Sequence, residues 1–266
     1  MIKPLHILVA ATLFVMAACG ADVETNPAPD ADATRNKVIV LGMIHSGHET
    51  SEVYSTERVK GVMRAIAPDY VLTEIPPDRM DEAMRGFTED GIVTEPRVTR
   101  FPEYKDALFP LLNEIEFEII PTAGWTREMA DFRSDALQAI SKDKAREGDW
   151  AAYQAGLETM RRTIGDRQDD PYYIHSDAYD EATKAGYTPY AELFANDLGV
   201  GDWERINAAH YSYIEQALDL HTGEGATILI TYGAGHKYWF LEQLRERTDI
   251  TLVSPLAYFD EVPAEQ

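Results

Sequence analysis

The sequence has only one cysteine, Cys19, among its 266 residues. A single cysteine can form no disulfide within the chain, and its place near the N-terminus leaves the rest of the sequence without a thiol nucleophile or a thiolate metal site. Positive charge is also scarce, since 24 Lys and Arg residues stand against 46 Asp and Glu residues and leave a formal net charge of -22. That charge repels phosphate backbones and anionic membrane surfaces, so we expect no nucleic-acid partner.

The N-terminus lacks a hydrophobic run long enough to cross a membrane. Its apolar run, Ile7–Ala18, is typical of the hydrophobic region of an export signal. Small residues precede Cys19, a pattern that resembles a bacterial lipoprotein signal, in which cleavage leaves a lipid-modified cysteine. We therefore predict a signal peptide at 1–19, a disordered polar tether at 20–36 and one folded domain at 37–266. In this hypothesis the protein is exported to the periplasm and touches the membrane only through lipidated Cys19, and an ordinary secretory signal is the alternative.

Apolar segments alternate between strand-like and helix-like patterns through the rest of the chain. Strands are predicted at Val38–Ile44, Tyr70–Ile75, Ile115–Ile120, Thr227–Tyr232 and Ile250–Phe259, and helices at Ser55–Ala67, Thr126–Arg146, Asp149–Ile164, Trp203–Leu220 and Tyr238–Arg247. The segment 169–200 has no clear period and is expected to be irregular. This order predicts an α/β fold with a mainly parallel central sheet flanked by helices, and with a helical or irregular insertion.

Polar residues follow three of the predicted strands. The motif G-x-x-H occurs twice, ending in His45 after the first strand and in His236 after the strand at 227–232, and Glu74 follows the second strand. Ligands of parallel α/β sheets bind beyond the carboxyl ends of the strands, so these side chains are expected to meet there.

Two imidazoles and a carboxylate suit a divalent metal cation such as zinc, manganese or cobalt. We therefore predict that His45, Glu74 and His236 bind such an ion. Glu74 is expected to be either a ligand or the general base that activates water. His48, three residues after His45, is a candidate fourth ligand or substrate contact, with an exposed loop histidine as the alternative. Each residue taken singly also has an ordinary structural explanation.

The segments VLGMIH, VLTEIP and TYGAGH, in this order, resemble the TraB/PrgY–GumN–Tiki family, within the superfamily that includes erythromycin esterase and ChaN-like haem-uptake proteins. The resemblance covers most of 37–259, although only these short motifs are specific. It implies an α/β fold with a compact site at the strand ends, and metal-dependent peptidase activity for Tiki-like members. Esterase-like members act without metal. By position His45 and His236 match the two motif histidines, and Glu74 matches the motif glutamate.

The same resemblance suggests further catalytic candidates. Arg58 lies one helix after the first motif, where relatives often use an arginine, and Arg205 and Asn207 lie on a helix that precedes the last motif. His210, on the same helix, is predicted to lie in the core or behind the site. The tyrosine-rich segment 169–190 is expected either to close over the site as a lid or to be ordinary packed surface.

The leading hypothesis from the sequence is an exported, lipid-anchored hydrolase that depends on a divalent metal and cleaves an amide or ester bond in a small molecule or peptide. The sequence has no G-x-S-x-G motif, which argues against a serine hydrolase built on Ser46. Two alternatives stay open: a metal-independent, esterase-like enzyme with a histidine base, and a protein that binds haem or another small ligand through tyrosines and histidines.

Overall fold

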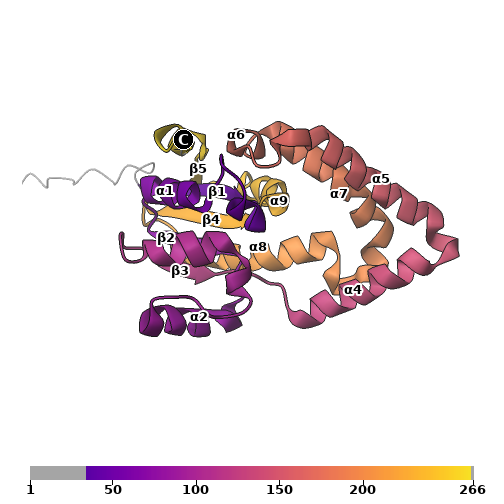
Figure 1. Ribbon diagram of the computed structural model, residues 1–266, viewed down its shortest axis with the longest axis horizontal. Coiled ribbons are helices and arrows are strands. Elements are labelled where there is room, and N and C mark those ends of the chain that lie inside the picture. Colours follow the sequence, from indigo (N-terminus) through magenta and orange to yellow (C-terminus); the bar gives the residue numbers. More distant parts are fainter. Residues whose placement is uncertain (1–33, 265–266) are drawn as a thin grey trace, which may run out of the picture.

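The computed structural model describes residues 34–264, so the predicted signal peptide, Cys19 and nearly all of the predicted tether lie outside the described residues. Within this range five strands form one sheet in the order β3-β2-β4-β1-β5, and every neighbouring pair is parallel (Figure 1). The strands are β1 (Asn36–Met43), β2 (Tyr70–Thr73), β3 (Glu118–Pro121), β4 (Thr227–Gly233) and β5 (Ile250–Leu252). The predicted α/β fold with a parallel sheet is confirmed.

The register of the central strands brings their carboxyl ends together. Met43 of β1 lies opposite Gly233 of β4, and Thr73 of β2 lies opposite Thr231 of the same strand. The residues that follow these three strands in the chain therefore emerge side by side at one edge of the sheet.

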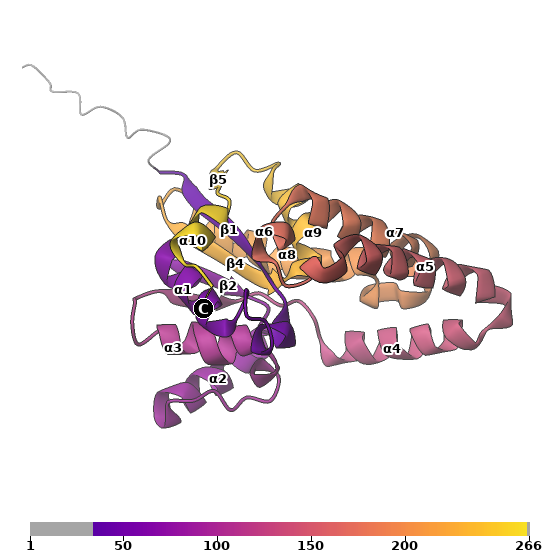
Figure 2. The ribbon, with the colours of Figure 1, turned by 45° about the horizontal axis from the view of Figure 1, so that its top comes forward.

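Helices cover both faces of the sheet, as a buried parallel sheet requires (Figures 1 and 2). On one face the apolar core joins β1 to α1, α2, α3, α10 and a short π-helix, and on the other face it joins the sheet to α8 and α9. The bounds are α1 (Thr56–Ile66), α2 (Pro77–Asp90), the π-helix (Glu103–Leu108), α3 (Phe109–Leu111), α8 (Trp203–Leu220), α9 (Ala234–Leu244) and α10 (Leu256–Glu261).

Local sequence explains why α1 forms where it does. The Ser55 side chain accepts a hydrogen bond from the Arg58 amide and caps the first turn. Val59, Met63 and Ile66 recur at helical spacing, and all three are buried against the sheet. The helix ends at Ala67, whose φ of 47° is left-handed.

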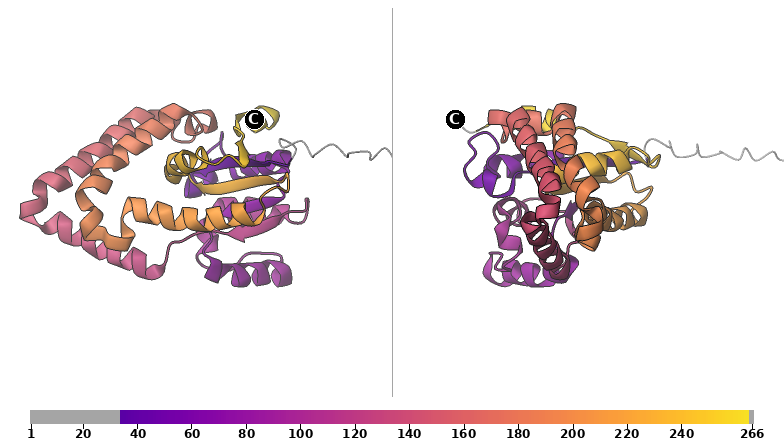
Figure 3. Two further views of the ribbon diagram at one scale, coloured as in Figure 1. Left: turned by 180° about the vertical axis from the view of Figure 1, so that it is seen from behind. Right: turned by 90° about the vertical axis from the view of Figure 1, so that its right-hand side faces the viewer.

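An arm of long helices extends away from the sheet (Figures 1 and 3). It consists of α4 (Arg127–Lys142), α5 (Glu147–Ile164) and α7 (Asp177–Leu198), and the short helix α6 (Pro171–Ile174) connects to it. The segment 169–200 was predicted to be irregular, and this prediction is wrong. Ser176 caps α7, and burial of residues such as Phe194 against α5 compensates for the poor helix propensity of the glycine and proline that α7 contains.

Other predicted boundaries shift by a few residues. The last predicted strand ends at Leu252, and Leu256–Glu261 is helical instead. The third strand begins at Glu118 rather than Ile115, and α9 begins directly after β4, four residues earlier than predicted. Within residues 34–264 no helix is long and apolar enough to cross a membrane.

Candidate functional site

Glu74 lies close to both of the histidines predicted from the strand ends. His45 Nε2 is 3.9 Å from Glu74 Oε2, and the same carboxylate oxygen accepts a hydrogen bond of 2.9 Å from the Gly233 amide. One ligand atom each of Glu74, His236 and His210 lies within 4.8 Å of the other two. The loops after β1 and β2 and the first turn of α9 therefore converge on Glu74.

His45 is held by a buried carboxylate that the sequence analysis did not identify. Its Nδ1 is 2.6 Å from Oε1 of Glu103, a residue of the π-helix with 0% exposure. Burial disfavours the imidazolium, but the hydrogen bond to Glu103 and the charge of Glu74 outweigh burial and raise the pKa of His45 above 6.5. His45 has a φ of 52°, which costs a non-glycine residue conformational energy and is common at functional sites.

Glu103 has the environment of an orienting group. Its second oxygen, Oε2, is buried and has no hydrogen-bond partner among the described residues, so the carboxylate depends on His45 for its main polar contact. A buried carboxylate that binds Nδ1–H directs the Nε2 lone pair into the site. This arrangement orients histidines that act as catalytic bases and histidines that bind metals.

His236 is held in the same way by a neutral partner. Asn207 donates through Nδ2 to the Trp203 carbonyl, so its Oδ1 is the atom that lies 2.7 Å from His236 Nδ1 and accepts the Nδ1 proton. The ring stacks on Trp203 with centroids 4.9 Å apart, and Tyr187 stacks on the other side of that indole. Burial lowers the pKa of His236 to about 3. The ring is therefore neutral and its Nε2 lone pair is free.

His210 has the opposite proton arrangement. The Gly124 amide donates to His210 Nδ1 at 2.9 Å, which requires a lone pair on Nδ1 and a proton on Nε2 in the neutral ring. Burial lowers the pKa of His210 to about 3, so the neutral form prevails. Glycine is needed at position 124 because a Cβ there would lie 2.5 Å from the backbone of Ala209. His210 thus presents an N–H donor to Glu74 and His236, in line with its predicted place behind the site.

Glu74 is positioned by backbone contacts at the end of β2. Its amide donates to the Tyr104 hydroxyl at 2.7 Å, and that hydroxyl donates in turn to the Thr231 carbonyl of β4 at 2.8 Å. Tyr104 is fully buried, so this bridge fixes the spacing between the ends of β2 and β4. The carboxylate therefore faces His45 and the Gly233 amide with little freedom to move.

His48 and Arg58 do not belong to this site. The Ile44 amide donates to His48 Nε2, and His48 Nδ1 donates to the Tyr54 carbonyl at 2.7 Å, so neither nitrogen can bind a metal. The prediction of His48 as a ligand or substrate contact is not compatible with this geometry. Arg58 is 6% exposed and donates to three backbone carbonyls, at Val53, Phe259 and Val262, which makes it a structural link between α1 and the C-terminal segment.

The other arginine candidate, Arg205, makes its hydrogen bonds and its ion pair with residues outside the histidine site. Arg205 donates to the carbonyls of Ala195 and Gly199 and forms an ion pair of 2.8 Å with Asp202, so it closes the turn before α8. Asn207 is the member of the predicted helix that reaches the site, as the hydrogen-bond partner of His236.

The protonation of each histidine ring determines which side chains have a free ligand atom for a metal ion. His210 belongs to the tightest group of donors, yet its Nε2 carries a proton and cannot coordinate while Gly124 occupies Nδ1. His45, Glu74 and His236 keep donor atoms available for a divalent cation, because both rings have Nδ1–H bound elsewhere and Nε2 free. The described group whose ligand atoms lie within 4.8 Å of one another, however, contains His210 and not His45. The chemistry of these donors fits zinc, manganese or cobalt. A haem site finds less support, because both nitrogens of His48 and of His175 are bonded to the backbone.

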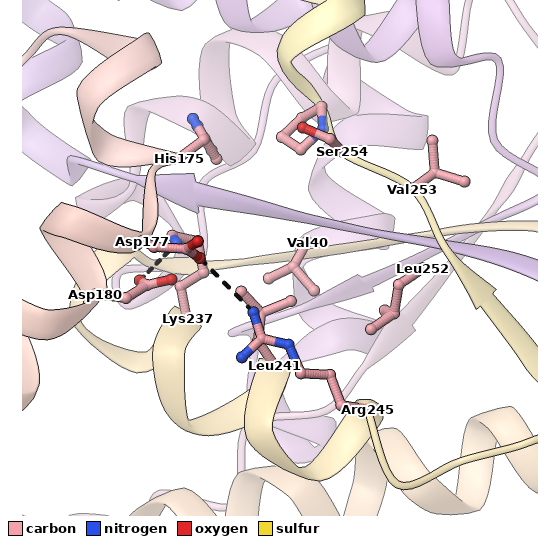
Figure 4. A pocket seen from close by; sticks show the side chains of 11 residues that line it. Val40, His175, Asp177, Asp180, Lys237, Leu241, Arg245, Leu252, Val253 and Ser254 are labelled. Carbon is pink, nitrogen blue, oxygen red and sulfur yellow. Dashed lines mark hydrogen bonds and ion pairs between the residues drawn. The ribbon is translucent and has the colours of Figure 1, made fainter.

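A separate cavity of about 230 Å³ lies beside the outermost strand of the sheet, β5, between that strand and the helices α7 and α9 (Figure 4). Lys237 follows His236 in α9 and is buried there. Its ammonium forms an ion pair of 2.5 Å with Asp180, which also lines this cavity.

Comparisons with protein-family models, with curated proteins and with solved structures find no match for the chain.

Proposed function

We propose that the protein is a hydrolase that cleaves an amide or ester bond in a small molecule or peptide, with His45 as the base that activates water. The observation that carries this proposal is the His45–Glu103 pair beside Glu74. A fully buried carboxylate holds Nδ1–H at 2.6 Å, and the free Nε2 lies 3.9 Å from a second carboxylate. The resemblance of the motifs around His45, Glu74 and His236 to the TraB/GumN/Tiki family supports the same reaction class.

His45 has the properties that a general base needs. Glu103 fixes its tautomer and stabilises the imidazolium that forms when Nε2 takes a proton. The hydrogen bond to Glu103 and the charge of Glu74 outweigh burial and raise the pKa of His45 above 6.5, which makes the ring a stronger base than a free imidazole. Glu74 lies next to Nε2 and can hold the attacking water by accepting its second hydrogen bond.

The neighbouring histidines suit the support and orientation of the reacting groups. His210 is buried and neutral and carries its proton on Nε2, so its N–H can donate to Glu74 or His236 and hold them in place. His236 offers a fixed acceptor that can orient a substrate N–H or O–H group.

A divalent cation bound by His45, Glu74 and His236 is the second candidate arrangement. The observation that favours it is the Asn207–His236 hydrogen bond, because metal-binding histidines commonly have Nδ1–H held by such an acceptor. When bound, the ion would polarise the carbonyl and lower the pKa of water. Export and lipidation at Cys19 complete the proposal and would place the reaction in the periplasm.

The test combines activity with metal content in the full chain. Hydrolysis of p-nitrophenyl acetate and of a peptide mixture is measured for the wild type, His45→Ala and Glu74→Gln, and bound metal is measured by mass spectrometry. His221→Ala is the control, because His221 pairs with Glu224 at the far end of α8. His45→Ala should lower kcat by about 10²–10⁴-fold.

The metal measurement separates the two arrangements. If His45 is the base, its alanine variant keeps whatever metal the wild type holds. If it is a ligand, metal and activity disappear together, and Glu74→Gln gives the same result. A wild type that hydrolyses neither probe, with or without added zinc, manganese or cobalt, would overturn the proposed function.

A further inference from the structure

A cavity of about 300 Å³ adjoins the histidine site near the β3 edge of the sheet. The loops after β2 and β3 form its walls, and Gly124, which binds His210, lies in its lining. Three arginines line it, Arg79, Arg97 and Arg127. One carboxylate, Asp78, also lines the cavity, so its wall carries an excess of positive charge although the chain as a whole carries a formal charge of -22.

The three arginines differ in how their charge is used. Arg79 lies 3.2 Å from Asp78, and Arg127 makes two hydrogen bonds of 3.0 Å to Asp131, so both are paired. Arg97 is half-buried, and its guanidinium forms no hydrogen bond or ion pair with any residue of 34–264. A half-buried arginine without a protein partner retains five N–H donors for a ligand.

Arg97 is also electrically coupled to the histidine site. Burial lowers the pKa of Arg97, and the charge of Glu74 is the largest effect that opposes this shift. Conversely, the charge of Arg97 adds to the effect of burial in lowering the pKa of His210. The geometric link between the cavity and the histidine site is Gly124, which lines the cavity and donates its amide hydrogen to His210 Nδ1.

We propose that this cavity binds a carboxylate of the substrate through Arg97, so that the bond cleaved lies beside a free carboxylate, as in an N-acyl amino acid or the last peptide bond of a chain. This inference rests on the proposed function for the identity of the bond. The planar guanidinium fork matches a carboxylate with two parallel hydrogen bonds. Trp125 and Tyr213 line the same cavity and offer apolar surface to the side chain next to the carboxylate.

A local arginine is needed because the protein's overall field opposes such a ligand. With 46 acidic and 24 basic residues, the surface repels anions at long range. A carboxylate therefore gains affinity only from direct contact in a partly desolvated place, which the Arg97 cavity supplies. An inorganic phosphate could use the same donors, and the experiment separates the two ligands.

The test measures binding rather than turnover, so it remains decisive even if the proposed reaction is wrong. Calorimetry compares N-acetyl-phenylalanine, its uncharged amide N-acetyl-phenylalaninamide, and inorganic phosphate, each with the wild type, Arg97→Gln and Arg162→Gln. Arg162 is the matched control, since it is 71% exposed on α5 and its loss changes net charge equally. Thermal melting checks that each variant is folded.

The wild type should bind the carboxylate about 10- to 100-fold more tightly than the amide, the difference expected for hydrogen bonds to a charged group. Arg97→Gln should abolish this preference, and Arg162→Gln should retain it. The inference is overturned if the wild type binds no carboxylate up to about 10 mM, if acid and amide bind equally, or if Arg97→Gln binds like the wild type. Tighter binding of phosphate than of the carboxylate would overturn the assignment of the ligand.

Discussion

A single methyl group added at Gly233 tests whether the approach of His45 to Glu74 is the reacting geometry. A Cβ at Gly233 would lie 2.6 Å from His45 Nε2 and 3.6 Å from Glu74 Oε2. The backbone there has φ -46° and ψ 130°, which alanine also adopts, so Gly233→Ala changes the space in front of the imidazole rather than the path of the chain.

The expected size of the effect follows from these distances. His45 Nε2 must move by roughly 0.9 Å to reach an ordinary contact of about 3.5 Å with the new methyl group. A misplacement of about 1 Å at a catalytic group costs about 100-fold in rate. The fold should lose much less, because about 1–3 kcal/mol of overpacking is offset by about 0.4–1 kcal/mol from the stiffer unfolded chain, which corresponds to a fall in Tm of less than about 8 °C.

Gly235→Ala is the matched control within the same motif. A Cβ at Gly235 meets its nearest neighbour, Tyr187, at 3.7 Å, which is an ordinary contact. Because Gly235 lies inside α9, alanine should leave activity intact and raise stability by up to about 1 kcal/mol.

The assay pairs hydrolysis of p-nitrophenyl acetate with an NMR titration of the histidine rings. Gly233→Ala should lower both kcat and the pKa of His45, because the ring moves away from the Glu74 charge that helps to raise it. If Gly233→Ala keeps wild-type activity and an unchanged His45 titration, the reasoning is refuted. An equal loss in Gly235→Ala would show that the motif tolerates no substitution for reasons unrelated to His45.

Two further predictions concern Glu103 and Cys19. Because the pKa of His45 is raised above 6.5, its pairing with Glu103 stabilises the fold below that pH, and the stabilisation is lost as pH rises through the raised pKa. Glu103→Gln should therefore lower Tm most at about pH 5 and least at about pH 9, and it should move the acidic limb of the pH–rate profile to lower pH. A Tm difference between the variant and the wild type that grows with pH would contradict the pairing. Cys19→Ala should release the protein from membranes into the periplasmic fraction, whereas a wild type that is already soluble there would contradict lipidation.

Sequence reasoning located the strand-end residues because a simple rule governs them. A buried strand followed by a turn exposes its next side chains at the carboxyl edge, and three such strands are neighbours in the sheet. His45, Glu74 and His236 follow from that rule. Glu103 does not, because it comes from a π-helix packed beneath the site, and the sequence between β2 and β3 shows no period that places this residue under His45.

The wrong prediction of an irregular segment at 169–200 has a different cause. Residues 177–198 contain residues of weak helix propensity, so a local pattern predicts an irregular chain. In the structure Tyr190 and Phe194 are buried in the arm, and Arg133 donates a hydrogen bond of 2.7 Å to the Tyr190 hydroxyl. Tertiary packing thus determines α7, and packing between segments distant in sequence is what local periodicity cannot report.

The roles of the histidines depend on which ring nitrogen meets a backbone amide, and the sequence does not encode this locally. His48, His175 and His210 each accept an amide hydrogen, from Ile44, Gly42 and Gly124 respectively. That contact fixes the proton on the other nitrogen and removes the ring from the set of bases and metal ligands.

His45 and His236 meet a carboxylate and a side-chain amide oxygen instead, so in these two rings the proton stays on Nδ1 and the lone pair on Nε2 faces the site. His48 lies only three residues from His45, yet its amide donor, Ile44, lies within the same turn. Sequence spacing therefore makes the two rings look equivalent. The hydrogen bonds distinguish them, because both nitrogens of His48 are bonded to the backbone, whereas Nε2 of His45 is free to take a proton from water or to bind a metal.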